Sequence, residues 1–343
     1  MKKKGGKGQI YKCRTRAKFK AEYTLNRTTV LLFCKAKKDG LNMRQYMLNF
    51  LLIVFACLPT NYFSFTFPAV QVSMRPEYIL TLSCPDQRGI VHSVSGFLAN
   101  HGCNIIDSAQ FGDAHSKLFF MRVHFSVEDF AISDQVLRAK FTEVARSWQM
   151  EWQLHDAHHK PRVVLMVSKI GHCLNDLLFR FKSGLLPVEI KAIISNHTDF
   201  YQLAASYNIP FHHLPLAAGA SAEEKHAQEQ RVLEVINANQ VELVVLARYM
   251  QILSNTMCQA LNGRAINIHH SFLPSFKGAK PYYQAHDRGV KLIGATAHFV
   301  TGDLDEGPII EQDVERVDHA MDPEKLTAIG RDVECVVLAR AVN

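Results

Sequence analysis

The sequence of 343 residues has no two cysteines separated by a pair of residues, and no spaced histidines beside them. Such spacings are the usual mark of a structural zinc site, so the sequence predicts no metal site of that kind. The eight cysteines are scattered instead, at positions 13, 34, 57, 84, 103, 173, 258 and 335. This distribution is typical of reduced thiols buried as small apolar side chains, and we expect a reducing, cytoplasmic location.

Basic residues are scarce in the part of the chain that is patterned like an enzyme. Residues 1–73 hold 14 Lys and Arg against 2 Asp and Glu, whereas the remaining 270 residues hold 25 against 30. The net charge of +7 therefore originates in the N-terminal extension. Because neutralising phosphates requires clustered Lys and Arg, we predict no nucleic-acid partner for the globular part.

The sequence also lacks a secure membrane span. The almost wholly apolar run at residues 46–58 is too short for one, and it lies too far from the N-terminus for an ordinary signal peptide. Regular patterning begins only at Met74. We therefore expect residues 1–73 to be an upstream extension outside the fold, with a targeting or anchoring segment as the alternative, and we predict no membrane partner.

Residues 76–157 follow the order strand, helix, strand, strand, helix, strand. The β-rich runs cover residues 78–84, 103–111, 118–125 and 150–154. Apolar residues at helical spacing from Ile90 to Leu98 predict the first helix, which Gly102 stops. A second helix is marked by Val136, Phe141, Val144 and Ala145. This order predicts a ferredoxin-like α+β module.

Two segments of this module resemble the ACT family of amino-acid-sensing domains, namely Cys84-Pro85-Asp86-Gln87-Arg88-Gly89-Ile90-Val91 and Gly102-Cys103-Asn104-Ile105. The resemblance implies that Asp86, Gly89 and Asn104 lie near a site for a small amino-acid effector, formed when two such modules pair. A homo-oligomer follows from that pairing. In the alternative interpretation Gly89 serves only the geometry of the turn, and the module only dimerises.

After a polar linker at residues 158–161 the pattern changes to apolar runs that alternate with helices. The runs at 163–167, 190–194 and 243–247 have the length of buried strands, and residues 222–237 form a predicted helix with Val232, Leu233 and Ile236 on one face. This alternation predicts that residues 160–343 form a Rossmann-like α/β domain around a mostly parallel sheet. Ligands bind such sheets at the carboxyl ends of the strands.

Three polar residues of this half suit acyl transfer. Asn267 and His269 are two apart in a predicted strand, so both side chains point to the same face. Asp305 lies in an acidic turn closed by Gly307-Pro308, which can hold a carboxylate rigidly over a cleft. Taken alone, each is as readily a cap, a structural histidine or a loop residue.

The stretch around these residues closely resembles the superfamily of glycinamide-ribonucleotide and methionyl-tRNA formyltransferases. The matching segments are residues 267–269, 271–274, 276–278, 294–296, 298–300 and 304–308. The resemblance implies that Asn267, His269 and Asp305 are catalytic, that His298 supports Asp305, and that the formyl donor is 10-formyltetrahydrofolate. It further implies that the folate binds at Met250, Leu253, Gly302 and Leu304. No metal or other cofactor is expected.

The loop after the first strand of this half, residues 168–176, bears on the formyl acceptor. Nucleotide formyltransferases are rich in Gly, Ser and Asn there and cradle a phosphate. Here the bulky Ile170, His172 and Cys173 leave few free backbone amides and little space. The chain also offers no basic C-terminal module for tRNA. Water is therefore the predicted acceptor, and hydrolysis to formate and tetrahydrofolate the predicted reaction.

The order of the two modules from Met74 onward resembles that of the formyltetrahydrofolate deformylase family. The resemblance implies a hydrolase that supplies formate for purine synthesis and balances the one-carbon folate pool. Family members continue past the segment matching residues 338–342, so the catalytic domain is expected to be short at its C-terminal end. Two alternatives stay open: a formyltransferase acting on a small amine or nucleotide, and a non-catalytic sensor of folate or an amino acid.

Overall fold

The computed structural model describes residues 75–128, 132–217, 219–275 and 281–343. The apolar run at 46–58 and the motif at 276–278 therefore lie outside the described residues. In the described ranges, no helix combines the length and the apolar character needed to span a membrane.

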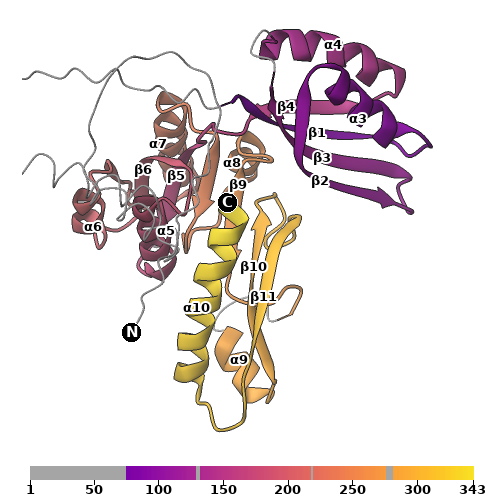
Figure 1. The fold of residues 1–343 in the computed structure, drawn as a ribbon. Helices are drawn as coiled ribbons and strands as arrows, with labels where there is room; N and C mark the ends of the chain where they lie inside the picture. The colour runs from indigo at the N-terminus through magenta and orange to yellow at the C-terminus, as the bar shows by residue number, and fades with distance from the viewer. Residues whose placement is uncertain (1–74, 129–131, 218, 276–280) are drawn as a thin grey trace, which may run out of the picture. The chain divides into compact units, whose positions relative to one another are not determined.

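The first module is a four-stranded antiparallel sheet with two helices on one face (Figure 1). Its elements are β1 (Glu77–Pro85), α3 (Ile90–Asn100), β2 (Cys103–Asp113), β3 (Leu118–Val127), α4 (Asp134–Ser147) and β4 (Glu151–Asp156). The strand order β2-β3-β1-β4 is the predicted ferredoxin-like arrangement. Alternate residues of β3, beginning with Phe119, Met121 and Val123, are buried in the core of this module.

The second predicted helix is present as α4. Of the residues that marked it, Val136 lies outside the core, with its side chain 40% exposed, while the adjacent Leu137 is buried. The buried residues Leu137, Phe141 and Ala145 are four apart and therefore lie on one side of the helix, from which Val136 is rotated away.

The second module is built on a seven-stranded sheet in the order β11-β10-β9-β8-β5-β6-β7. The strands are β5 (Arg162–Val167), β6 (Glu189–Ser195), β7 (Phe211–His213), β8 (Leu243–Leu246), β9 (Ala265–His269), β10 (Leu292–Phe299) and β11 (Ile309–Arg316). Strands β5 to β9 pair in parallel, whereas β10 is antiparallel to both β9 and β11. The predicted mostly parallel α/β sheet is confirmed.

Two apolar cores cover the two faces of this sheet, as the alternation in β5 requires. Val163, Leu165 and Val167 face one core, while Val164 and Met166 face the other. The helices around the sheet are α5 (His172–Ser183), α6 (Tyr201–Ser206), α7 (Ala222–Ala238), α8 (Asn255–Ala260), α9 (Pro281–Asp287) and α10 (Pro323–Val342).

Helix α10 covers the antiparallel end of the sheet. It packs along β10 and β11 and also contacts α5 and α9 (Figure 1). Asp322 begins it as the N-cap, accepting a hydrogen bond from the Lys325 backbone N–H, and Pro323 follows in the first turn. The carboxyl ends of β5, β8 and β9 meet at one edge of the sheet, beside this helix. A parallel sheet binds ligands at such an edge.

Candidate active site

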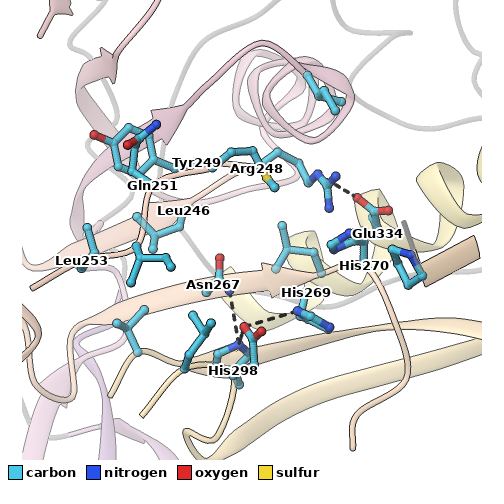
Figure 2. A pocket seen from close by; sticks show the side chains of 18 of the residues that line it. Leu246, Arg248, Tyr249, Gln251, Leu253, Asn267, His269, His270, His298 and Glu334 are labelled. Atoms are coloured by element: carbon cyan, nitrogen blue, oxygen red, sulfur yellow. Dashed lines mark hydrogen bonds and ion pairs between the residues drawn. The ribbon is translucent and has the colours of Figure 1, made fainter. Parts of the chain in front are cut away.

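Strand pairing brings the predicted catalytic residues together. Asn267 and His269 lie on β9, and the antiparallel pairing of β9 with β10 sets His298 directly opposite Asn267. Asp305 reaches the same place from the loop between β10 and β11: its Oδ1 is 3.3 Å from Nδ1 of His269 and 3.7 Å from Nε2 of His298. Figure 2 shows the side chains of Asn267, His269 and His298 converging there. One carboxylate therefore contacts two imidazoles.

Hydrogen bonds to the backbone fix the state of His298. Its Nδ1 lies 2.9 Å from the carbonyl oxygen of Phe299, so Nδ1 must carry the proton and donate it. In the neutral ring Nε2 is then an acceptor, and it lies 3.3 Å from the side-chain nitrogen of Asn267. This contact orients the amide of Asn267, which keeps a second N–H for a ligand.

His269 has one nitrogen held by protein and one that is not. Its Nδ1 faces Asp305, while Nε2 is buried and has no hydrogen-bond partner among the described residues. The side chain is only 5% exposed. In the imidazolium form both ring nitrogens are donors, and Nε2–H can then donate to an oxygen that develops negative charge.

The loop that carries Asp305 is tightly closed. Phe299 donates its backbone N–H to the carbonyl of Pro308 at 2.9 Å, and Gly307 packs so close that a Cβ there would lie 1.7 Å from the carbonyl oxygen of Phe299. Asp305 itself has a φ of 58°, a left-handed conformation that Asp tolerates better than most residues. Gly307 is therefore required for the position of the carboxylate.

The surroundings of Asp305 lower the pKa of its carboxyl group. The contact with the imidazole of His269, which is the largest cause, holds the pKa of this carboxyl well below its usual range, although burial acts in the opposite direction. The carboxylate is therefore ionised throughout the neutral range.

This shift makes the stability of the fold depend on pH. Since the pKa of Asp305 is lower in the folded than in the unfolded chain, the ionised carboxylate stabilises the fold above pH of about 4 and loses that effect as the pH falls further. The free energy of unfolding should thus differ more between wild type and Asp305→Asn at pH 7 than at pH 3. Urea denaturation at both pH values measures this, and an equal difference at both would contradict it.

A cavity of about 550 Å³ opens beside these residues. It is lined by Asn267, His269, His298 and Asp305, and also by all four predicted folate-binding residues, Met250, Leu253, Gly302 and Leu304. Met250 and Leu304 are more than half exposed, so they offer apolar surface to a ligand. The structure thus gathers both sets of predicted residues around one cavity.

The loop after β8 forms one wall of the cavity, and hydrogen bonds from buried polar side chains hold its backbone in place. Ser168 accepts a hydrogen bond from the backbone N–H of Met250 and donates one to the side chain of Asn196. Ser254 caps α8 and is held in turn by the carboxylate of Glu229, which is 4% exposed. These bonds fix the backbone of residues 248–254 at the end of β8.

The sequence did not reveal a second polar cluster in the same cavity. Glu334 of α10 is 1% exposed, accepts hydrogen bonds from Tyr282 and His172, and lies 3.5 Å from Arg248. Figure 2 shows Arg248 pointing toward Glu334, away from Asn267 and His298. The only hint of this cluster in the sequence was Glu334 itself, an acidic residue that directly precedes an apolar stretch of the helix.

The charges of this cluster depend on one another. Burial alone would raise the pKa of Glu334, but the hydrogen bond from His172 and the charge of Arg248 lower it. The neighbouring His270 has its pKa lowered to about 4 by burial and by Arg248. At neutral pH the cluster therefore has an ionised glutamate and an uncharged His270.

The loop predicted to exclude a phosphate needs one correction. Residues 168–171 form the loop, but α5 already begins at His172. Ile170 and His172 line the cavity as expected, whereas Cys173 is wholly buried in the sheet core and does not fill the loop. In the first turn of α5 the side chains of His172 and Cys173 point in different directions, so His172 faces the cavity and Cys173 faces the core. Because the segment was predicted to be a loop, this difference was not expected.

The predicted effector residues of the ACT-like module are not gathered within one chain. Asp86 and Gly89 follow β1, whose end pairs with Leu118, while Asn104 is the second residue of β2 and pairs with Ser126 at the other end of β3. Eight residues of an extended strand separate these ends, which is roughly 25 Å. A single site containing all three therefore requires two modules.

Comparison with known families defines the class of the protein. Residues 161–342 match the formyl transferase family and residues 78–140 match the ACT domain. The chain therefore belongs to the formyl transferase family and carries an ACT domain ahead of its catalytic fold. Both parts agree with the resemblances that the sequence motifs indicated.

Relatives of similar length narrow this class. The formyltetrahydrofolate deformylase of Corynebacterium sp. (strain P-1) is 49% identical over 79% of this chain and 94% of its own length, and that of Bacillus subtilis is 49% identical over 77% and 87%. The crystal structure of the enzyme of that name from Burkholderia mallei matches with a TM-score of 0.72 at 54% identity, covering 78% of this chain and 93% of its own. The chain belongs to the formyltetrahydrofolate deformylase family, whose members are hydrolases.

Proposed function

We propose that the protein hydrolyses 10-formyltetrahydrofolate to formate and tetrahydrofolate. The single observation that carries this proposal is the Asp305 carboxylate, which two imidazoles hold at the wall of a cavity that also exposes apolar surface. Membership of the deformylase family supports the same reaction. The substrate's pterin is assigned to the wall formed by Met250 and Leu253, and its formyl group to Asn267 and His269.

The proposed chemistry assigns one task to each side chain. Asp305 orients a water molecule whose oxygen forms a bond to the formyl carbon. The carbonyl oxygen becomes an oxyanion, which accepts hydrogen bonds from the amide of Asn267 and from Nε2–H of His269. The bond from carbon to the folate nitrogen then breaks, that nitrogen takes a proton, and formate leaves.

The lowered pKa of Asp305 limits its part in proton transfer. A carboxylate that is so weakly basic does not retain a proton at neutral pH, so we assign it to orienting the water and relaying the proton. His298 contacts the carboxylate and is held by the carbonyl of Phe299, and we assign it to fixing Asp305. No step requires a metal or a nicotinamide.

The cavity favours water over larger acceptors. Where a phosphate cradle would begin, Ile170 and the His172–Glu334 pair occupy the wall. A buried, ionised glutamate at that place would repel a phosphate. Transfer of the formyl group to a nucleotide is therefore less well supported than hydrolysis. A purely sensing role is also disfavoured, because a sensor does not need the assembled catalytic residues.

One incubation separates these functions. Purified protein is supplied with 10-formyltetrahydrofolate and no acceptor, and formate is measured. Hydrolysis predicts steady formate release that an added amine does not accelerate. Release or product formation only in the presence of an amine would identify a transferase, and no turnover under either condition would leave a sensor.

For the ACT module we propose a small amino-acid effector bound between two copies of the chain. The separation of Asp86 from Asn104 within one module supports a shared site. The edge strand β2 and its neighbour expose Ile106, Phe111 and Phe120, which supports pairing into a homo-oligomer. The free thiols of the five cysteines in the described ranges agree with the cytoplasm as location, where released formate would supply purine synthesis and balance the folate pool.

A further inference from the structure

A group of potential metal ligands lies where α5 and α10 meet. His172 and Cys173 open α5, and Cys335 follows Glu334 in α10. One ligand atom from each of these three residues lies within 4.8 Å of the other two. The proposed hydrolysis uses none of the three as a reacting group, so their convergence needs its own explanation.

The surroundings of His172 match those of a metal-bound imidazole. Its Nε2 lies 2.8 Å from the carboxylate of Glu334, whereas its Nδ1 is buried and has no hydrogen-bond partner among the described residues. A metal-binding histidine usually donates its other ring N–H to a carboxylate, which fixes the tautomer and points the free lone pair at the ion. Glu334 is 1% exposed and can do this without competition from water.

The two thiols complete a soft ligand set. The Sγ atoms of Cys173 and Cys335 lie within 4.8 Å of each other, and Cys173 is wholly buried. A divalent cation would displace the protons from both sulfurs. Two thiolates with an imidazole select a thiophilic ion such as Zn²⁺ over Mg²⁺ or Ca²⁺.

We propose that His172, Cys173 and Cys335 bind one thiophilic divalent cation of the Zn²⁺ type, with Glu334 orienting the imidazole. Tetrahedral Zn²⁺ places its sulfur ligands roughly 3.8 Å apart, a little closer than the 4.8 Å limit that the three ligand atoms already meet. Small rotations of the three side chains would therefore bring the ligand atoms to the distances that tetrahedral Zn²⁺ requires. His172 lines the cavity, so an ion can enter from there, and a water molecule takes the fourth position.

The ion would join the first helix of the catalytic module to its last. Because α5 and α10 are far apart in the sequence, this link stabilises the folded state by mass action whenever the cation is present. The site contains none of the residues that carry out the proposed hydrolysis and does not depend on that reaction.

Cobalt is a direct probe of such a site. The full-length protein is reduced, freed of metal and titrated with Co²⁺, while absorption in the visible and near-ultraviolet reports tetrahedral thiolate coordination. We expect one equivalent to produce these bands, Zn²⁺ to remove them, and Zn²⁺ to raise the Tm. Cys335→Ser should weaken binding at least tenfold, whereas Cys103→Ser, which changes a similarly part-buried thiol in the ACT module, should not.

The same titration can overturn the proposal. Absence of thiolate bands in the reduced wild-type protein would do so. So would Co²⁺ binding that is as tight in Cys335→Ser as in wild type, because the ligands would then lie elsewhere in the chain. His172→Gln provides a second variant with the same expectation, and circular dichroism verifies that both variants are folded.

Discussion

Replacing Asp305 with asparagine is expected to lower kcat for formate release by about 10²- to 10⁴-fold with little change in KM. Asparagine has the same shape and accepts the left-handed backbone at this position, so the loop should be preserved. It cannot supply the negative charge that His269 and His298 contact. Steady-state kinetics with 10-formyltetrahydrofolate measure the effect.

A matched control for this variant lies in the same loop. Asp303 is exposed and also lines the cavity, but in the described part of the chain its side chain forms no ion pair with either imidazole, so Asp303→Asn should change kcat by no more than a few-fold. A near-normal rate in the Asp305 variant would remove the carboxylate from the mechanism. Equal losses of kcat in both variants would indicate that turnover depends on the conformation of the loop and not on the Asp305 carboxylate.

His269→Ala is expected to lower kcat by about 10²- to 10³-fold, the usual cost of removing one donor to an oxyanion. The variant removes an imidazole that lines the cavity and whose buried Nε2 has no partner in the described part of the chain. Asn267→Ala should have an effect of similar size. Folate binding, measured by equilibrium titration with a non-hydrolysable analogue, should stay within a few-fold of wild type.

The control for His269 is His286→Ala on α9. His286 is 41% exposed and pairs only weakly with Asp287, so its loss should leave kcat unchanged. If His269→Ala weakened folate binding as strongly as it slowed turnover, the residue would bind substrate and not stabilise the transition state. A rate within threefold of wild type would exclude it from the site.

Much of the fold could be predicted because the sequence patterns are local. Buried parallel strands need continuous apolar runs, so residues 163–167 and 243–247 were recognisable without any partner strand. The spacing of Asn267 and His269 on β9 was equally a property of one strand. Both residues, which the resemblance implied to be catalytic, line the cavity.

What could not be predicted depends on contacts between distant segments. The register of β10 against β9, which sets His298 opposite Asn267, is fixed by pairing and cannot be read from either strand. The same holds for Glu334, whose partners His172, Arg248 and Tyr282 come from three other segments. Cys173 was misplaced because the start of α5 was read as a loop.

The central claim is that water receives the formyl group at Asp305, and a single turnover in water enriched in ¹⁸O tests it most directly. Excess enzyme is mixed with 10-formyltetrahydrofolate, without any amine, and the formate is analysed by mass spectrometry. Hydrolysis predicts formate that carries one ¹⁸O atom, formed quickly by the wild type and far more slowly by Asp305→Asn. Formate without the label, or none until an amine is added, would contradict the assignment.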